Sequence, residues 1–244
     1  MKTIGLIGGM SWESSAVYYQ IINQRVQAHL GGVHSAQILL YSVDFGEIAQ
    51  LQHAGNWEQL TELLLDAAHR LERGGADFLV LCTNTMHKLA ARLQERSSLP
   101  LLHIADATAA AVRQRGLRKV GLLGTRFTME EEFLRGRLNL HQLDVLVPDE
   151  PDRTIIHNVI YEELVKGSIR EESRREYVRI IGALTAAGAE GIILGCTEIG
   201  LLVTAQHTDA ILFDTTLIHA EQAAALALAD ANVYARHWAS APVS

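Results

Sequence analysis

The sequence predicts an α/β protein of two similar lobes, each a mainly parallel sheet flanked by helices. Two observations predict this fold class. The first is that short apolar, β-branched runs alternate with segments of helical periodicity, as in parallel strands joined by helices. The second is that two of these runs, residues 78–81 and 191–195, are each preceded by Gly-Ala and an acid and followed by Cys-Thr. The chain has only two cysteines, and both occupy this position.

The matched cysteine strands are part of a longer internal repeat. The matched pairs and their offsets are Gly5 with Gly121 (116), Gly75 with Gly188 (113) and Cys82 with Cys196 (114). Such near-constant offsets indicate a duplication, so we expect two lobes related by a pseudo-twofold axis. The first lobe is predicted to comprise residues 1–104 plus 211–244, and the second residues 105–210. Each lobe then carries one cysteine, and the active site is expected in the cleft between the lobes.

The remaining elements are predicted from local signals. Further strands are predicted at residues 3–7, 37–43, 100–104, 120–123, 145–148 and 211–214. One helix is predicted from the turn at residues 8–12 through Val26, and another around His87 after the first cysteine strand. Two more helices, at 56–73 and 128–141, each begin with a capping box. Further helices are predicted at 152–166, 171–187 and 217–228. Residues 44–55 are interpreted as an irregular polar connection, and the tail to Ser244 as short and frayed.

Composition narrows the function classes. The chain has 244 residues, of which 48% are hydrophobic and 20% charged, as in an ordinary globular protein. The net charge of −7 and the absence of a basic cluster argue against a nucleic-acid partner. No apolar run is as long as a membrane span, and the N-terminus enters a strand without a signal peptide. With no Cys-x-x-Cys motif, we expect reduced thiols and a cytoplasmic protein.

The two Cys-Thr motifs suggest acid–base chemistry. A polar residue that follows a parallel strand lies at the carboxyl edge of the sheet, where open α/β sheets bind ligands. A thiol ionises near pH 8.5, and its surroundings can lower this value. One thiolate and one thiol on opposite faces of a substrate could remove a proton and return another. The alternative is that each cysteine only fills space in the core. The matched positions of the two cysteines argue against this alternative.

The turn after the first strand, Gly8-Gly9-Met10-Ser11-Trp12, has two interpretations. Its glycines allow a tight turn and close approach of a ligand, and the following helix offers unpaired N–H groups. It lacks the spacing of the dinucleotide-binding fingerprint and a partner acid. A plain connecting turn and a ligand loop both fit the sequence.

These motifs together resemble those of the aspartate/glutamate racemase family. The resemblance covers essentially the whole chain and is closest to the branch of bacterial broad-specificity amino-acid racemases and L-aspartate/glutamate-specific racemases. The motifs that carry it are Gly8-Gly9-Met10-Ser11-Trp12-Glu13-Ser14, Cys82-Thr83-Asn84-Thr85-Met86-His87-Lys88, Gly124-Thr125 and Gly195-Cys196-Thr197-Glu198. It implies an isomerase that racemises a small amino acid without pyridoxal phosphate, metal or nucleotide, and a homodimer.

The resemblance also assigns roles to residues. Cys82 and Cys196 would be the two acid/base residues, on opposite faces of the α-carbon. The residues that would line the cleft and hold the amino-acid head group are Thr83, Asn84, Thr85, Thr125 and Thr197. Met10 and Ser11 would belong to the ligand loop of the first turn.

The chain departs from related patterns near the predicted substrate side chain. Glutamate racemases that serve cell-wall synthesis carry Asp-Ser where this chain has Gly8-Gly9, and His where it has Glu198, which we include among the candidate binding residues. Archaeal-type aspartate racemases use an Arg in the loop after strand two and a Lys before a glycine. Residues 44–52 hold no Arg, Gln52 is the candidate there, and Lys166 is one residue out of register. A broader side-chain pocket is plausible.

Other functions stay open on the sequence. Hydantoin racemase, maleate isomerase and decarboxylase reactions belong to the same superfamily, although the decarboxylase commonly needs one cysteine. A non-catalytic thiol or zinc-binding protein is a different class, but structural zinc ligands usually come in closely spaced pairs. A pyridoxal enzyme would need a Schiff-base lysine, and none of the four lysines lies in a recognised motif.

Overall fold

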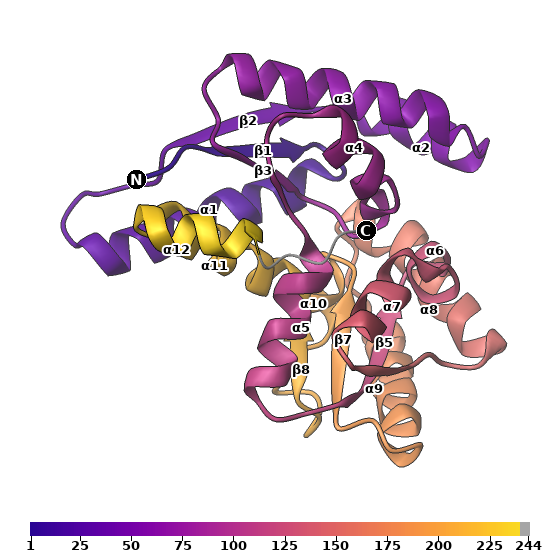
Figure 1. Ribbon diagram of the computed structural model, residues 1–244. Helices are drawn as coiled ribbons and strands as arrows, with labels where there is room; N and C mark the ends of the chain where they lie inside the picture. The colour runs from indigo at the N-terminus through magenta and orange to yellow at the C-terminus, as the bar shows by residue number, and fades with distance from the viewer. Residues whose placement is uncertain (240–244) are drawn as a thin grey trace. The chain divides into compact units, whose positions relative to one another are not determined.

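The computed structural model describes residues 1–239 and divides the chain into two compact units (Figure 1). The first unit comprises Met1–His103 and the segment from His219 onward, and the second comprises Ile104–Ile218. The elements of the first part of the chain are β1 (Ile4–Gly8), α1 (Trp12–Leu30), β2 (Ile38–Ser42), α2 (Phe45–His53), α3 (Trp57–Arg73), β3 (Phe78–Leu81), η1 (Thr85–Leu89), α4 (Ala90–Arg96) and β4 (Leu101–Leu102). Those of the second part are α5 (Ile104–Gln114), β5 (Lys119–Gly124), α6 (Arg126–Glu130), α7 (Glu132–Leu140), β6 (Asp144–Leu146), α8 (Glu150–Glu162), η2 (Leu164–Lys166), α9 (Glu171–Ala186), β7 (Gly191–Gly195), α10 (Ile199–Leu202), β8 (Leu212–Asp214), α11 (Thr215–Leu228) and α12 (Ala231–Ala239).

Each unit contains one four-stranded parallel sheet. The strand orders are β2-β1-β3-β4 and β6-β5-β7-β8, so corresponding strands occupy corresponding places. In the first sheet Ile4 pairs with Phe78, and in the second Val120 pairs with Gly191, with every neighbouring pair parallel. The predicted α/β fold of parallel sheets flanked by helices is confirmed.

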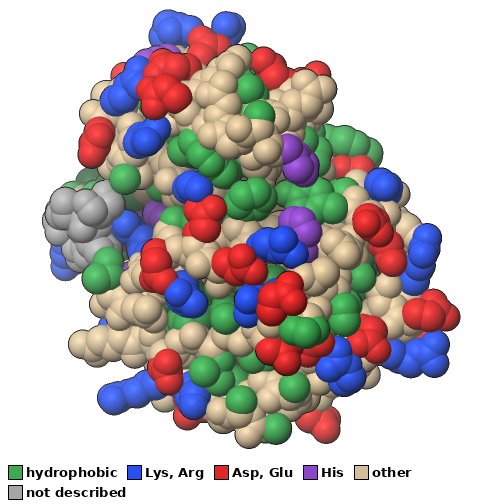
Figure 2. Space-filling model, turned by 90° about the vertical axis from the view of Figure 1, so that its right-hand side faces the viewer, with side chains coloured by type: hydrophobic (Ala, Val, Ile, Leu, Met, Phe, Trp, Pro, Cys, Tyr) green, Lys and Arg blue, Asp and Glu red, His purple; other side chains and the backbone are tan. Residues whose placement is uncertain are grey.

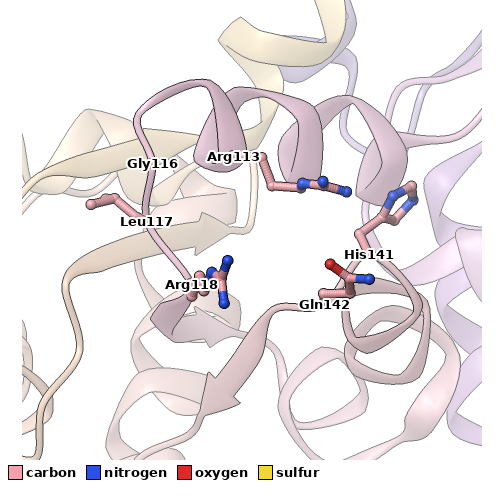
Figure 3. A pocket seen from close by; sticks show the side chains of 6 residues that line it. All are labelled: Arg113, Gly116, Leu117, Arg118, His141 and Gln142. Carbon is pink, nitrogen blue, oxygen red and sulfur yellow. The ribbon is translucent and has the colours of Figure 1, made fainter.

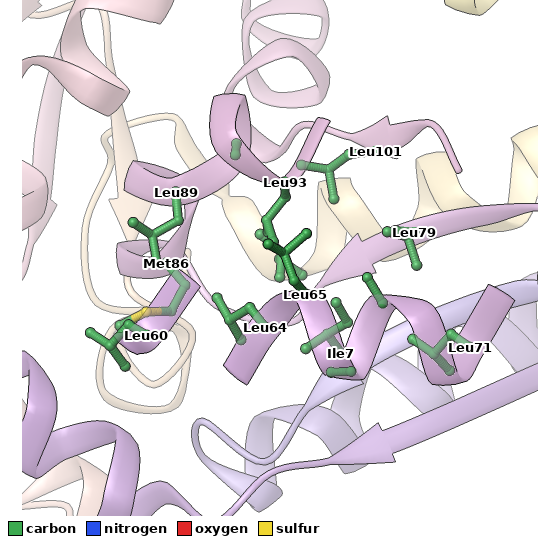
Figure 4. Packing of buried hydrophobic residues seen from close by; sticks show 14 of the residues in the cluster. Ile7, Leu60, Leu64, Leu65, Leu71, Leu79, Met86, Leu89, Leu93 and Leu101 are labelled. Carbon is green, nitrogen blue, oxygen red and sulfur yellow. The ribbon is translucent and has the colours of Figure 1, made fainter. Parts of the chain in front are cut away.

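Helices cover both faces of the first sheet because its strands are apolar on both sides. One face carries Ile7, Leu79 and Leu81, which pack against α2, α3, η1 and α4 (Figure 4). The other face carries alternate residues of the same strands, and α1, α11 and α12 pack on it. Burial on both faces explains why these strands are continuous apolar runs rather than alternating ones.

The second sheet has the same three-layer construction. Leu123, Ile192 and Leu194 pack with α8 and α9 on one face. Val120, Leu122 and Ile193 pack with α5 and α7 on the other.

The segment predicted to be irregular after β2 is a helix, which corrects the interpretation of residues 44–55. Asp44 caps α2, because its Oδ1 accepts a hydrogen bond from the backbone N–H of Gly46 at 2.9 Å. Ile48 is 1% exposed and joins the apolar cluster under α3. The helical pattern of this short polar segment is weak, and packing of its one apolar side against the core stabilises the helix.

The helix predicted over residues 128–141 is two helices with an earlier start. Thr125 caps α6 directly after β5, and its Oγ1 accepts a hydrogen bond from the N–H of Thr128 at 3.4 Å. Thr128 is therefore inside the helix rather than at its cap. Glu131 has extended backbone angles (φ −88°, ψ 154°) and separates α6 from α7.

Within the described residues, the end of the chain is a helix and not the frayed tail that the sequence predicts. Asp230 accepts hydrogen bonds from the N–H groups of Asn232 and Val233 and starts α12. The ring of Tyr234 lies 6.3 Å from that of Phe78, and its hydroxyl donates to the Asp77 carbonyl at 2.9 Å. The rest of the predicted tail, residues 240–244, lies outside the described residues.

The units differ from the predicted lobe boundaries at two places: Ile104 begins the second unit rather than ending the first lobe, and the second boundary falls later in the chain. Residues 211–218 were assigned with the first lobe, whereas the second unit extends to Ile218. The reason is that β8 pairs with β7, so the last strand completes the second sheet. Within residues 1–239 there is no helix of the length and apolarity needed to cross a membrane.

Acidic and basic side chains are interspersed on the face shown in Figure 2. Most of the ion pairs involve exposed side chains, for example Arg92 with Glu58 at 2.9 Å. Exposed pairs of this kind contribute about 0–1 kcal/mol each. Burial of the two layered cores therefore accounts for the fold.

Candidate active site

Cys82 follows β3 at the carboxyl edge of the first sheet. Its backbone N–H donates to the Ile7 carbonyl at 3.0 Å, which continues the β1–β3 ladder by one residue. The side chain is fully buried in the apolar cluster that contains Val80 and Tyr18. Burial raises the pKa of the Cys82 thiol far above its ordinary value, because an apolar environment disfavours the thiolate. Cys82 is therefore a neutral thiol at physiological pH in this structure.

Cys196 follows β7 at the carboxyl edge of the second sheet, in a more polar environment. It is 9% exposed, and its Sγ donates a hydrogen bond to Oε2 of Glu198 at 3.0 Å. Burial raises the pKa of this thiol, and the neighbouring Glu198 carboxylate raises it further. Backbone hydrogen bonds from Thr197 and Glu198 act in the opposite direction, because N–H groups stabilise a thiolate.

The strand before Cys196 lies unusually close to β5. A Cβ atom on Gly195 would lie 2.8 Å from the Leu123 carbonyl oxygen, and one on Gly124 would lie 2.9 Å from the Gly195 carbonyl oxygen. Glycine is thus needed at both positions for the two backbones to meet. Thr125, which follows Gly124, is brought to the same sheet edge as Cys196.

The turn after β1 is held by its own hydrogen bonds. Gly9 has φ +92°, and a Cβ there would lie 2.3 Å from the Val43 carbonyl oxygen. The Gly9 N–H donates to Ser15 Oγ at 2.8 Å, while Ser11 Oγ caps α1 by accepting from the Ser14 N–H at 3.3 Å. Met10 is 6% exposed and packs in the apolar cluster beneath α3.

Three of the other predicted residues of the first unit, Gln52, Asn84 and Thr85, are also buried. Asn84 is 3% exposed and Thr85 is 7% exposed, and both follow Cys82 directly as the chain enters η1. Thr83 is half-buried, and its carbonyl accepts a hydrogen bond from His87 Nδ1 at 2.8 Å. Gln52, on α2, is 4% exposed. The parallel pairing of β1 with β3 brings the turn at Met10 and Ser11 to the same edge as Cys82.

Three predicted residues of the second unit, Cys196, Thr197 and Glu198, form a hydrogen-bonded group after β7. Thr197 Oγ1 donates to Glu198 Oε2 at 2.6 Å, and the same oxygen accepts from Cys196. Glu198 is only 5% exposed. Thr125 Oγ1 lies 3.1 Å from Thr128 Oγ1 at the start of α6. Lys166, out of register in the sequence, is exposed at the end of η2.

A buried cluster of rings in the first unit was not found from the sequence. His87 and His103 have ring centroids 4.7 Å apart, and His87 and His219 have centroids 5.7 Å apart. His219 Nε2 donates to the Leu102 carbonyl at 3.0 Å, so its Nδ1 accepts from the Tyr18 hydroxyl at 2.8 Å. These residues come from distant parts of the chain, and no local motif joins them. His87 is 2% exposed, so its ring belongs to the core of the first unit.

Two surface pockets of the second unit lie apart from the predicted site residues. One, of about 190 Å³, is lined by Arg113, Gly116, Leu117, Arg118, His141 and Gln142 (Figure 3). The other, of about 460 Å³, lies beside Leu212 and Leu217. Neither pocket is lined by a residue that the sequence analysis assigns to the active site. Within residues 1–239, no group of three or more His, Cys, Asp or Glu side chains is arranged to hold a metal ion.

Comparison with known proteins identifies the class to which this geometry belongs. A family model described as Asp/Glu/Hydantoin racemase matches residues 7–223. The chain therefore belongs to the Asp/Glu/hydantoin racemase family, and membership of a racemase family supports an isomerase. The predicted family resemblance is confirmed.

Individual relatives agree with this assignment. A candidate Asp/Glu racemase from Yersinia pestis is similar over 94% of this chain and 100% of its own, with 56% identity and a TM-score of 0.89. An aspartate racemase homologue from Pyrococcus horikoshii OT3 has 33% identity and a TM-score of 0.80, covering 93% of this chain and 99% of its own. The broad-specificity amino-acid racemase RacX from Bacillus subtilis is 20% identical over 222 residues, which is 87% of this chain and 92% of RacX.

Proposed function

We propose that this protein is a cofactor-independent amino-acid racemase in which Cys82 and Cys196 are the two acid/base residues. The observation that carries the proposal is that in each unit the second central strand is followed by a buried cysteine and then a threonine. Both pairs lie at the carboxyl edge of a parallel sheet, which is where such sheets bind ligands.

The chemistry needs one thiolate and one thiol together. The α-C–H of an amino acid is a very weak acid, so a base must be held within hydrogen-bond reach, and an acid must supply the returning proton. The raised pKa values of both thiols suit this task in one respect, because a thiolate of high pKa is a stronger base. The same values mean that few molecules hold a thiolate at rest, so one thiol must lose its proton during the reaction.

The substrate class is an α-amino acid, with aspartate and glutamate or a broader set as candidates. Thr83, Asn84, Thr85, Thr125 and Thr197 are proposed to hold the amino and carboxyl groups that all substrates share. Met10, Ser11 and Gln52 are proposed to contact the side chain. No Arg is available in α2, so an acidic side chain would depend on neutral donors, and uncharged side chains become acceptable.

The experiment that tests the function is a panel of L- and D-amino acids incubated with the purified protein in deuterated water. Chiral chromatography would measure racemisation, and mass spectrometry would measure α-deuterium. We expect both without added pyridoxal phosphate or metal, and unchanged after treatment with a chelator. Activity that appears only when a cofactor is added would contradict the proposal.

Two further properties are proposed with the function. Reaction through two thiols requires that they stay reduced, so we propose that the enzyme works in the cytoplasm. A homodimer follows from the family resemblance, and analytical ultracentrifugation would test it.

A further inference from the structure

The smaller pocket of the second unit, of about 190 Å³, lies where two packed helices end (Figure 3). It is formed by the turn that follows α5 and by the turn that follows α7. Figure 3 shows the side chains of Arg113, Arg118, His141 and Gln142 around one open space. These polar side chains come from two separate segments of the chain, so the fold and not a local motif brings them together.

The two arginines of this pocket are unpaired. Within residues 1–239, neither the Arg113 nor the Arg118 guanidinium forms a hydrogen bond or an ion pair. Most other arginines of the chain are paired with an acid, for example Arg137 with Asp106 at 2.7 Å. Two unpaired charges of the same sign repel each other, so an anion held between them would be stabilised.

The acids near the pocket are engaged by other partners. Asp106 Oδ1 accepts hydrogen bonds from Arg137 Nε at 2.7 Å and from His141 Nε2 at 2.8 Å. Glu190 Oε2 accepts from the backbone N–H of Arg118 at 2.7 Å rather than from its guanidinium. None of the described residues that line the pocket is a carboxylate, so the negative charge that would balance the two arginines has to come from a ligand.

The ends of the two helices do not by themselves account for the cations. A helix C-terminus attracts cations through its unpaired carbonyl groups. Here the Arg113 carbonyl accepts from the Gly116 N–H at 2.9 Å, and the Asn139 carbonyl accepts from the Gln142 N–H at 2.8 Å. Backbone donors therefore already satisfy carbonyl groups at both helix ends, and Arg118 lies beyond the end of α5.

Gln142 occupies a backbone position that favours glycine. Its φ is +63°, and within residues 1–239 it is the only residue other than glycine with a positive φ. The corresponding turn after α5 uses Gly116, with φ +74°. A side chain in this conformation is strained, because its Cβ crowds the backbone. A glutamine at this place is accounted for if its amide has a use in the pocket that glycine could not serve.

We propose that this pocket binds a phosphate group, carried by free phosphate or by a small phosphate ester. Arg113 and Arg118 supply charge-assisted hydrogen bonds in the fork geometry that matches phosphate oxygens, and the Gln142 amide supplies a further N–H. The pocket is smaller than the roughly 300–1,000 Å³ of sites for drug-sized ligands, so a compact group fits it. An α-amino acid is disfavoured, because its ammonium group would meet the two guanidinium groups.

The phosphate site is separate from the candidate active site. Arg118 immediately precedes β5, whereas Thr125 follows β5 at the opposite edge of the second sheet. A strand of this length, at about 3.3 Å per residue, separates the two edges by ~20 Å. The proposal does not rest on the racemase activity, and either proposal can fail while the other stands.

The first test is titration calorimetry of the full chain with inorganic phosphate and with glycerol 3-phosphate, at constant ionic strength. Arg113→Gln and Arg118→Gln should each weaken binding about tenfold or more, because each removes a hydrogen bond to a charged group. Arg115→Gln is the matched control, since it removes an exposed arginine of the same segment that lines the other pocket, and it should bind as tightly as the wild type. Tighter binding of the ester would identify a phosphorylated small molecule as the ligand, and tighter binding of phosphate would identify the free ion. Excess aspartate should not displace either probe.

The second test measures the thermal unfolding midpoint as a function of phosphate concentration. Phosphate stabilises folded proteins in general, so the informative quantity is the difference between variants. Binding to the folded site adds a further rise of the midpoint, which should be present in the wild type and in Arg115→Gln and absent from Arg118→Gln. Gln142→Gly should raise the midpoint without phosphate, because glycine adopts a positive φ freely, and should still weaken phosphate binding about threefold or more.

Three results would overturn the proposal. They are the absence of saturable binding of both probes, equal affinity in Arg118→Gln and the wild type, and displacement of phosphate by aspartate. Unchanged phosphate affinity in Gln142→Gly would overturn the role assigned to the amide. Absence of racemisation by the wild-type protein would overturn the proposed function and would leave these binding results as they are.

Discussion

Cys82 and Cys196 follow corresponding strands of two similar units, yet their surroundings are different. Cys82 lies in an apolar cluster, and burial alone raises its pKa. Cys196 donates to a carboxylate and is flanked by backbone donors. A duplication can therefore preserve strand and motif while the residue two positions later, Asn84 or Glu198, changes the chemistry of the thiol.

The two cysteines also differ in the sheet face against which they pack. Ile4 pairs with Phe78 in the first sheet, and Val120 pairs with Gly191 in the second. Measured from these paired residues, Cys196 lies one residue further along its strand than Cys82 does. Because a shift of one residue reverses the face of a side chain, Cys82 joins the cluster under α1, whereas Cys196 joins the cluster under α8 and α9.

The largest expected effect comes from removing either thiol. Cys82→Ser and Cys196→Ser should each lower racemisation by at least about 1000-fold, because a hydroxyl is a far weaker acid than a thiol and cannot replace it as a base. One variant can retain α-deuterium exchange of a single enantiomer, and the other variant should then retain exchange of the opposite one. Chiral chromatography and mass spectrometry measure both. Racemisation near the wild-type rate in either variant would contradict the two-base mechanism.

The contrast between Asn84 and Glu198 predicts a stability effect. Asn84→Asp places a carboxyl group in a site that is only 3% exposed. It should destabilise the protein by about 3 kcal/mol at neutral pH. Burial would raise the pKa of this Asp above its unfolded value near 3.9, so the penalty should shrink as pH falls toward 4. Urea denaturation at several pH values checks this, and a penalty independent of pH would argue against a buried charge.

The buried thiols predict how stability depends on alkaline pH. A thiol whose folded pKa is raised contributes stability that is complete below its unfolded pKa and is lost as pH rises toward the folded pKa. Above about pH 8.5 each such thiol should reduce the free energy of unfolding by about 1.4 kcal/mol per pH unit. Cys82→Ala should therefore show a shallower decline than the wild type between pH 8.5 and 10. Parallel curves would mean that Cys82 ionises normally in the folded protein.

The smallest expected effect concerns side-chain choice, where the units differ again. The spacing of 114 residues between the cysteines also separates Gln52 from Lys166, so a neutral residue in one unit corresponds to a cation in the other. Gln52→Ala should change the ratio of kcat/KM between acidic and neutral amino acids by about tenfold, and Gln52→Arg should shift it toward aspartate. Deuterium exchange chemistry should persist in both variants. If neither variant changes the profile, Lys166 is the next candidate for the choice of side chain.

The sequence by itself determined the elements whose signals are local. Apolar runs of strand length marked β1, β3, β5 and β7, because residues buried on both sheet faces leave no polar positions. Asn56 was correctly identified as the cap of α3, since its side chain accepts from the Gln59 N–H only three residues away. The repeated Cys-Thr motif and the family resemblance were also visible in the sequence.

Tertiary structure decided what depends on partners distant in the chain. The helix α2 forms because Ile48 packs beneath α3, and α12 is ordered by contacts of Tyr234 with Phe78. The buried rings of His87, His103 and His219 meet only after the first unit folds. The ionisation of the two thiols follows the same rule, because desolvation and a hydrogen bond to Glu198 are properties of the packed site and not of the Cys-Thr motif.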